Sequence, residues 1–326
     1  MMEGESDLVT ISNLRVYFQT RHGTVKAVDD VGLSIKPRKV VGLVGESGSG
    51  KSTLGFTIMR LLPPQARIVQ GKIMFQGKDL TKLSEQDIRE IRGKKISMVF
   101  QDPLSFLNPV MKIGDQIVEA IARSEASKSE SDQKKALELL ERMGIPSSRK
   151  ILDDYPHQLS GGMRQRVLIA IATVSNPSLL IADEPTTALD VTVQAQILEE
   201  IKNLGQKIDS SVLLITHDLG IVAETCHEVI VMYAGRIAEY AGAEALFETP
   251  LHPYTAALLD SALSIDEFKK KLVGIPGDVP NLINPPRGCR FHPRCTKAMP
   301  RCSEEEPTPF EVGSNHSVYC WLYERN

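Results

Sequence analysis

A glycine-rich stretch near the N-terminus has the residue types and the spacing of a phosphate-binding loop. It fits the pattern G-x-x-x-x-G-K-[ST], and its residues are Gly45, Glu46, Ser47, Gly48, Ser49, Gly50, Lys51, Ser52 and Thr53. Glycines keep side chains away, so that phosphate oxygens can approach backbone N–H groups and the positive end of a following helix. We expect Lys51 to reach the β- and γ-phosphates of a nucleotide and the Ser52 hydroxyl to bind Mg²⁺.

The segments on either side of this loop fit the elements that must position it. Residues 40–44 are a short apolar run that predicts a buried strand, and residues 54–60 predict a helix. A chance glycine-rich turn is the alternative, and it gives no reason for a strand and a helix to flank the turn.

Two adjacent carboxylates end a second apolar run. Residues 179–182 predict a buried strand, and Asp183 and Glu184 follow it directly. In a phosphate-loop fold, the first carboxylate at such a strand end supports Mg²⁺ directly or through water. We expect Glu184 to polarise the water that attacks the γ-phosphate. The alternative is a solvated turn, which the apolar run before the carboxylates does not favour.

A second helix start that could bind an anion lies further along the chain. Ser160 is a natural N-cap, and Gly161 and Gly162 would expose backbone N–H groups at the start of a helix that includes residues 167–175. Such a helix start needs a second phosphate, or the same phosphate approached from another subunit.

Together these motifs resemble the ATP-binding subunit of an ABC transporter, whose signature L-S-G-G stands here at residues 159–162. Met163 replaces the Gln that usually follows the signature, and the M-R-Q-R form is familiar in the peptide and nickel import branch. The resemblance implies an ATP site with Mg²⁺ in which Asp183, Glu184 and the signature residues act as described.

The resemblance also implies roles for residues that would say little alone. Gln101 would contact Mg²⁺ and sense the membrane subunit, and His217 would be the switch histidine at the γ-phosphate. Asp190 would lie in the loop that crosses the dimer interface. Phe18 would stack on adenine, although the neighbouring Tyr17 leaves the register open.

The expected fold class is α/β. The resemblance implies a RecA-like phosphate-loop core with an antiparallel β subdomain, an inserted helical subdomain at about residues 103–165, and a small Cys-containing C-terminal extension. The predicted division is an ABC ATPase domain over residues 1–244 and the extension over residues 245–326. Ser131 is predicted to cap an amphipathic helix over residues 131–144.

Composition limits the function further. A length of 326 residues suggests about two domains. The net charge of −3 offers no general attraction to nucleic acid or anionic lipid. No apolar stretch reaches the ~20 residues that span a bilayer, and residues 1–7 lack the pattern of a signal peptide. We therefore expect a protein at the cytoplasmic face of the cell membrane, held there by membrane subunits.

Four cysteines near the C-terminus are candidates for a metal site. They are Cys289, Cys295, Cys302 and Cys320, spaced C-x₅-C-x₆-C-x₁₇-C. Disulfides are disfavoured in the cytosol, zinc usually uses tighter cysteine pairs, and a [4Fe–4S] cluster tolerates varied spacing. Residues 274–286 and 289–295 resemble the C-terminal extension of oligopeptide and dipeptide transporter ATPases, which in some members holds such a cluster. The prediction is iron–sulfur, with Zn²⁺ or empty thiols as alternatives. Cys226 is predicted to be inert.

The resemblance implies an ATP-hydrolysing subunit that energises import of di- and oligopeptides by ATP-driven, head-to-tail dimer closure. Its partners would be a second, homologous ATPase subunit in a heterodimer, two membrane permease subunits and an extracytoplasmic solute-binding protein, without nucleic acid. Nickel or oligosaccharide import by the same machinery is one alternative. A soluble ABC ATPase acting on nucleic acid or ribosomes is another, and a metal-sensing module dominated by the C-terminal segment is a third.

Overall fold

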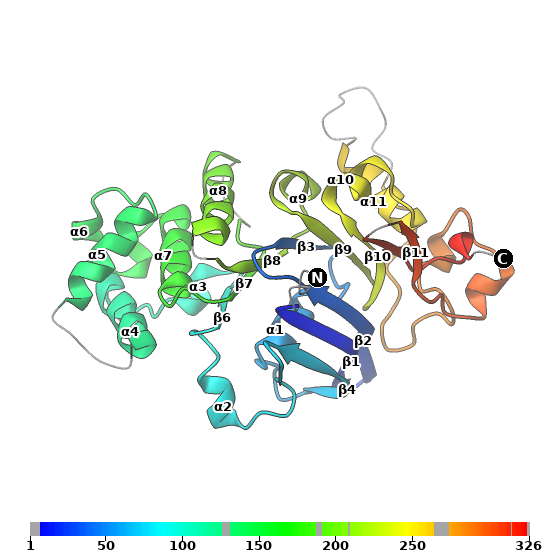
Figure 1. The fold of residues 1–326 in the computed structure, drawn as a ribbon, viewed down its shortest axis with the longest axis horizontal. Helices are drawn as coiled ribbons and strands as arrows, with labels where there is room; N and C mark the ends of the chain where they lie inside the picture. The colour runs from blue at the N-terminus through cyan, green and yellow to red at the C-terminus, as the bar shows by residue number, and fades with distance from the viewer. Residues whose placement is uncertain are drawn as a thin grey trace, which may run out of the picture. The chain divides into compact units, whose positions relative to one another are not determined.

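A computed structural model of the chain describes residues 7–125, 131–186, 191–207, 209–263, 274–313 and 315–324. The chain divides into two compact units (Figure 1). The first comprises Met1–Lys82 and Ile215–Asn326, and the second comprises Leu83–Leu214. The first unit therefore contains both the phosphate loop and the C-terminal cysteines, although more than 230 residues separate Gly50 from Cys289 in the sequence.

An antiparallel sheet forms the N-terminal part of the first unit. Its strand order is β2-β1-β4-β5. The strands are β1 (Val9–Thr20), β2 (Gly23–Ile35), β4 (Ala66–Phe75) and β5 (Lys78–Asp79). Strand β1 pairs with both β2 and β4, and its residues Val9, Ile11, Leu14 and Val16 are buried. The expected antiparallel β subdomain is confirmed.

A second sheet in the first unit joins the strand before the phosphate loop to the C-terminus. Strand β3 (Val40–Val44) runs parallel to β9 (Glu228–Tyr233), and β9 pairs antiparallel with β10 (Arg236–Gly242). Strands β12 (His316–Val318) and β11 (Phe310–Gly313) continue the sheet in that order beyond β10 (Figure 1). The C-terminal extension therefore adds two strands to the sheet that contains β3.

Helices complete the first unit. They are α1 (Lys51–Ile58), α9 (Leu219–Thr225), α10 (Ala243–Glu248) and α11 (Pro253–Leu263), with 3₁₀ turns η2 (His292–Arg294), η3 (Pro300–Ser303) and η4 (Trp321–Tyr323). One buried cluster contains Val44 before the loop, Tyr233 on β9, Tyr254 on α11 and Phe291 in the extension. The three aromatic rings lie 4.6 to 5.3 Å apart in tilted and edge-on contacts, the geometry that aromatic pairs prefer.

The second unit combines parallel strands with helices. Strand β6 (Ile96–Val99) pairs parallel with β7 (Leu179–Asp183), and β8 (Ser211–Ile215) follows β7 in the sheet order. The helices are α2 (Glu85–Arg89), α3 (Pro103–Phe106), α4 (Ile113–Glu125), α5 (Asp132–Arg142), α6 (Ser148–Ile151), α7 (Gly161–Thr173) and α8 (Val191–Lys207), with the 3₁₀ turn η1 (Pro156–Gln158).

The predicted helical insertion is present, but one predicted helix cap in it is wrong. From α3 to α7 the described residues contain helices and turns but no strand. Helix α5 buries Ala136 and Leu140, which form its apolar side. Ser131, however, has helical backbone angles and makes no side-chain capping hydrogen bond, so the predicted cap is wrong. An N-cap needs extended backbone for its oxygen to reach back to the first turn.

In the part of the chain that the structure describes, no helix is both long and apolar enough to cross a membrane.

A buried carboxylate, Asp29 on β2, organises the charges of the first unit. It accepts a hydrogen bond from the Tyr17 hydroxyl at 2.7 Å and lies 3.4 Å from nitrogens of Arg15 and Arg236. It also pairs with Arg290 of the extension, whose side chain is 3% exposed. Burial alone would raise the pKa of Asp29, but the Tyr17 hydrogen bond and the charges of the three arginines outweigh it and lower the pKa.

We expect Asp29→Asn to lower the free energy of unfolding by about 3–5 kcal/mol, because it leaves the buried Arg290 without its counter-charge. The difference from wild type should be constant above the unfolded-state carboxyl pKa of about 3.9 and shrink as pH falls through the lower folded-state pKa. Urea denaturation from pH 7 to pH 3 measures both. The control is Asp30→Asn, which alters a neighbouring carboxylate that is 33% exposed. Equal stability of the Asp29 variant and wild type at pH 7 would contradict the role of this pair.

Candidate functional site

The phosphate loop lies between β3 and α1, and its backbone conformation explains its glycines. Gly45, Gly48 and Gly50 have φ of 148°, 77° and 101°, in the region that side chains rarely adopt. A Cβ on Gly45 would lie 2.1 Å from the Met232 carbonyl oxygen, and one on Gly50 would lie 2.2 Å from that of Ala27. The loop therefore packs directly against β9 and β2, with no space for side chains at these two positions.

Lys51 places a positive charge at the start of α1. Its side chain is buried, and its ammonium donates to the carbonyls of Gly45 at 2.8 Å and Glu46 at 2.9 Å. Helix α1 begins at Lys51 rather than at residue 54 as predicted. The ammonium and the positive end of the helix dipole therefore lie at the same loop, the arrangement expected of an anion-binding site.

The neighbours Tyr17 and Phe18 of β1 have different environments. The Tyr17 hydroxyl is hydrogen-bonded to Asp29, so Tyr17 belongs to the buried charge network. Successive residues of a strand point to opposite faces, and Phe18 lies partly exposed on the other face. Both side chains are partly exposed, so the stacking role of Phe18 stays a prediction.

His217 follows β8, within the first unit. The N–H of the preceding Thr216 donates to the Leu43 carbonyl at 3.2 Å, which places this turn beside β3. The His217 side chain is exposed, and Asp218 caps α9 by accepting from the Ile221 N–H at 3.2 Å. The histidine therefore stands on a turn fixed on both sides, next to the strand that leads into the phosphate loop.

The second unit brings two of the predicted catalytic residues together. The Gln101 side-chain amide donates to the Glu184 carboxylate at 2.8 Å, across 83 residues of sequence. Asp183, the last residue of β7, is buried. Glu184 has φ of 44°, a left-handed conformation for a residue that is not glycine. Such backbone costs free energy and is concentrated at functional sites.

The signature begins α7 as predicted. Ser160 is the N-cap, and its hydroxyl accepts from the Met163 N–H at 3.3 Å. A Cβ on Gly162 would lie 2.6 Å from a methyl carbon of Val193, so helix α8 packs closely at this point. Arg166 on α7 donates to the Met143 carbonyl and pairs with Glu200 of α8.

Glu200 of α8, the partner of Arg166, has an altered pKa. Burial raises the pKa of Glu200 to about 7, despite the opposing charge of Arg166. Asp190 of the predicted interface loop lies outside the described residues.

Burial, and to a smaller degree the neighbouring thiols, raise the pKa of three of the four C-terminal cysteines, Cys289, Cys295 and Cys320. Burial, and then the charges of Cys302, Cys320 and Cys295, raise the pKa of Cys289 to about 12. Burial raises the pKa of Cys320 to about 11, and all four cysteines are free. Among the residues that the structure describes, however, no group of three or more His, Cys, Asp or Glu side chains is arranged to hold a metal ion. Burial also raises the pKa of Cys226 to about 12, in keeping with an inert thiol.

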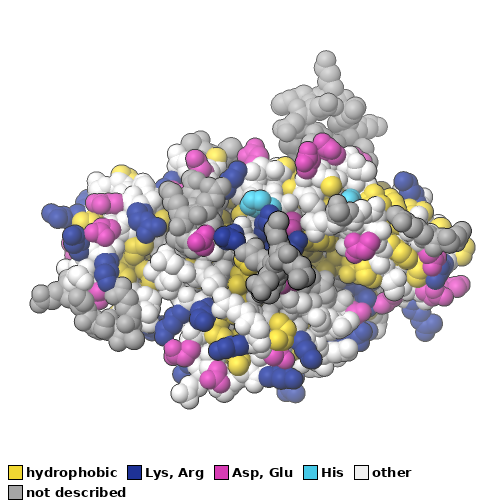
Figure 2. Space-filling view, viewed as in Figure 1, with side chains coloured by type: hydrophobic (Ala, Val, Ile, Leu, Met, Phe, Trp, Pro, Cys, Tyr) yellow, Lys and Arg dark blue, Asp and Glu magenta, His cyan; other side chains and the backbone are white. Residues whose placement is uncertain are grey.

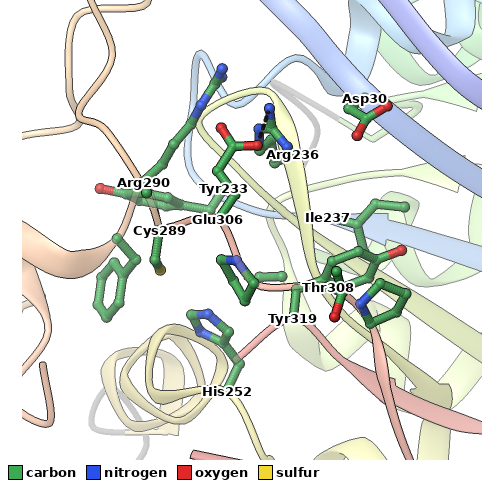
Figure 3. Close-up of a pocket in the computed structure, with 15 residues that line it drawn as sticks. Asp30, Tyr233, Arg236, Ile237, His252, Cys289, Arg290, Glu306, Thr308 and Tyr319 are labelled. Carbon is green, nitrogen blue, oxygen red and sulfur yellow. Dashed lines mark ion pairs between the residues drawn. The ribbon is translucent and has the colours of Figure 1, made fainter. Parts of the chain in front are cut away.

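A cavity of about 230 Å³ lies in the first unit, and Figure 3 shows the residues that line it. Residues of β10 and of the extension line it, and the ion pair of Arg236 with Glu306 at 2.8 Å lies at its wall. His252 also lines it, and burial lowers the pKa of His252 to about 4, so that the ring is neutral at pH 7. No residue of the phosphate loop is part of this lining.

Two residues that the sequence analysis leaves without a role contact the loop. Arg294 forms an ion pair with the Glu46 carboxylate at 2.7 Å, and the Tyr254 hydroxyl accepts from the Glu46 N–H at 2.8 Å. The sequence signal for Arg294 is weak, since it is one arginine in a basic, cysteine-containing loop.

Comparison with known proteins agrees with these motifs. The family model for ABC transporters matches residues 28–187, and the model for the oligopeptide/dipeptide transporter C-terminal region matches residues 238–302. The oligopeptide transport ATP-binding protein AppD of Bacillus subtilis (strain 168) is 49% identical over 98% of both chains. The dipeptide transport ATP-binding protein DppD of Lactococcus lactis subsp. cremoris (strain MG1363) is 47% identical over 98% of this chain and 91% of its own.

Solved structures give the same result for the fold. The dimeric, post-hydrolysis structure of the ATP-binding cassette MJ0796 bound to ADP and Pi has a TM-score of 0.65 and 28% identity, and the match covers 72% of this chain and 98% of that one. The fold is that of an ABC ATPase cassette, as predicted. Because the similarity in sequence extends over nearly the whole length, the chain belongs to the ABC transporter family, among members that carry the oligopeptide/dipeptide transporter C-terminal region.

Proposed function

We propose that the protein is the ATP-hydrolysing subunit of an ABC importer for di- and oligopeptides. The observation that carries the proposal is similarity over the whole chain, C-terminal region included, to relatives named as oligopeptide and dipeptide transport ATP-binding proteins. In the proposed division, residues 1–244 form the ATPase domain, with a helical subdomain at about 103–165, and residues 245–326 form the extension.

Each predicted site residue has a proposed role in ATP hydrolysis. Lys51, now bonded to loop carbonyls, turns to the β- and γ-phosphates when ATP displaces those carbonyls. The Ser52 hydroxyl, Asp183 and Gln101 would hold Mg²⁺, and this ion would neutralise charge on the phosphates. Their oxygen donors suit this hard cation. Glu184 orients and deprotonates the attacking water, and the remaining roles go to His217 at the γ-phosphate and Phe18 at adenine.

Dimer closure is proposed from the signature helix. The hydroxyl of Ser160 and the N–H groups of Gly161 and Gly162 would bind the γ-phosphate of ATP held by another subunit, because a helix N-terminus is an anion site. Asp190 would lie at the same interface. The other subunit is proposed to be a homologous ATPase, and hydrolysis would open the pair by removing the γ-phosphate contact.

An exposed apolar surface after Gln101 supports the proposal that the protein binds a membrane subunit. Leu104, Phe106 and Val110 are 53%, 48% and 81% exposed, and Phe106 stacks on Phe100 with ring centroids 3.7 Å apart. Exposed apolar patches mark sites of protein contact. We assign this surface to the permease subunits, which would hold the protein at the cytoplasmic face of the membrane and connect it to an extracytoplasmic solute-binding protein.

The alternatives use the same site or a different partner. Nickel or oligosaccharide import would leave every described residue with the same role. For an ATPase acting on nucleic acid, a concentration of basic side chains is expected. On the face drawn in Figure 2, Lys and Arg side chains are interspersed with Asp and Glu.

We propose further that Cys289, Cys295, Cys302 and Cys320 bind a [4Fe–4S] cluster, with Zn²⁺ as the alternative. The support is the donor set, four free thiols of which Cys302 and Cys320 are buried and Cys289 and Cys295 partly buried, and the backbone bond from the Cys289 N–H to the Cys302 carbonyl at 2.8 Å. Since they are not arranged to hold a metal among the described residues, binding requires the thiols to move closer together. A cluster would be structural, because phosphoryl transfer needs no electrons.

Replacing the proposed catalytic carboxylate tests the hydrolysis step. Glu184→Gln should retain ATP binding and lower turnover by ~10²–10⁴-fold, the usual size of a general-base effect. Phosphate release by the assembled transporter measures turnover. The matched control is Glu199→Gln, on an exposed position of α8. Near-normal turnover in Glu184→Gln would remove this carboxylate from the role.

Two substitutions separate the subunit's own ATP site from the one that it completes. Lys51→Ala should abolish nucleotide binding by the isolated chain, because the loop loses its positive side chain. Ser160→Arg should preserve that binding and block hydrolysis only in the assembled pair. Calorimetry measures ATP binding by each isolated variant, and Lys94→Ala is the surface control. If both variants lose ATP binding equally as monomers, the head-to-tail proposal fails.

Metal analysis tests the thiol proposal. Protein purified without oxygen should be brown and contain about four irons and four sulfides per chain. Cys295→Ser should bleach the colour, whereas Cys226→Ala, outside the proposed ligand set, should retain it. Colourless protein with one zinc per chain would favour the alternative, and metal-free protein would contradict both.

A further inference from the structure

The C-terminal extension contacts the phosphate loop at Glu46. Arg294 pairs with both oxygens of the Glu46 carboxylate, with Nη1 at 2.7 Å from Oε2 and Nη2 at 3.1 Å from Oε1. The Arg294 side chain is only 5% exposed, and that of Glu46 is 25% exposed. A two-pronged contact of this kind fixes direction as well as distance, and burial protects it from screening by salt.

Other bonds hold Arg294 in this orientation. Its Nε donates to the Pro276 carbonyl at 2.8 Å, and Nη2 donates to the Ile275 carbonyl at 3.1 Å. Nη1 also donates to the Tyr233 hydroxyl at 3.2 Å, and the guanidinium carbon lies 5.7 Å from the centre of the Tyr233 ring. The guanidinium is therefore positioned by the extension and by β9, whatever Glu46 does.

Tyr254 holds the backbone of the same loop residue. Its hydroxyl accepts from the Glu46 N–H at 2.8 Å. The ring is fully buried and packs against Tyr233 of β9 at 4.6 Å and against Phe291 of the extension at 5.3 Å. Tyr254 is thus a rigid support that reaches the loop from α11.

All three polar groups of Glu46 consequently have partners within the protein. The N–H donates to Tyr254, the carbonyl accepts from Lys51, and the carboxylate pairs with Arg294. A carboxylate in a loop that receives phosphates is unfavourable unless a positive charge neutralises it, because like charges repel at short range. Arg294 supplies that charge from outside the loop.

We propose that Arg294 and Tyr254 are positioning residues for nucleotide binding, which fix Glu46 and cancel its charge so that the loop accepts ATP. The inference rests on the proposed ATP site at Lys51. It gives the C-terminal extension a direct part in nucleotide affinity, beyond any part in holding a metal.

Titration of the isolated full chain with a fluorescent ATP analogue tests the charge argument. Arg294→Gln should weaken binding about tenfold, equivalent to ~1.4 kcal/mol, because it leaves the Glu46 carboxylate unpaired. The double variant Glu46→Gln with Arg294→Gln should recover most of this loss, since neither charge is then present. If Arg294 mattered only for folding of the extension, the double variant would bind as weakly as the single one.

Matched controls make each outcome decisive. Arg301→Gln removes another arginine of the extension, which pairs with Glu305 and Glu324, and it should bind as wild type does. Binding by Arg294→Gln equal to that of Arg301→Gln would overturn the proposal.

Two further variants cover the remaining cases. If thermal denaturation shows that Arg294→Gln does not fold, Tyr254→Phe replaces it as the test, because it removes one hydroxyl and keeps the ring. Tyr254→Phe should weaken binding several-fold, and unchanged binding would overturn the proposal. If instead Lys51→Ala binds ATP as well as wild type, the proposed ATP site itself is wrong and the inference falls with it.

Discussion

A buried guanidinium must have a counter-charge. Two buried arginines near the C-terminus meet this need by pairing with carboxylates near the N-terminus. Arg290 and Arg294 both lie in the loop between Cys289 and Cys295, and their side chains are 3% and 5% exposed. Their partners are Asp29 on β2 and Glu46 in the phosphate loop, 261 and 248 residues away. Leaving either charge unpaired in the interior would cost several kcal/mol. The position of the extension and the positions of β2 and the phosphate loop therefore depend on one another.

Apolar packing also makes the extension depend on the rest of the first unit. The described elements of the extension are helix α11, strands β11 and β12 and three 3₁₀ turns, and such a segment buries too little surface to fold alone. It adds its strands to β10, and its Phe291 packs against both Tyr233 and Tyr254. The core of the extension is thus the core of the nucleotide-binding unit, which explains why both belong to one compact unit although the sequence suggests a boundary near residue 244.

Local patterns allowed much of this to be predicted. The strand over residues 40–44, the glycine-rich loop and the Ser160 cap each depend on a few consecutive residues, and the structure has them as expected. The predicted start of α1, at residue 54, lies three residues after the observed one, and the predicted Ser131 cap is wrong. Both errors arise because helix ends depend on backbone angles that composition does not determine. The partners of Glu46 could not be predicted, since they come from distant segments that meet only in the folded chain.

These contacts give a physical reason for the spacing between Cys289 and Cys295. Five residues separate Cys289 from Cys295, and they include both arginines that reach the nucleotide-binding part. A ligand that bound both thiols would close this loop and reduce the conformational freedom of everything within it. The side chains of Arg290 and Arg294 would then lose less entropy on pairing with Asp29 and Glu46. Binding of such a ligand would therefore couple order at the thiols to order at the phosphate loop, through the five residues between Cys289 and Cys295.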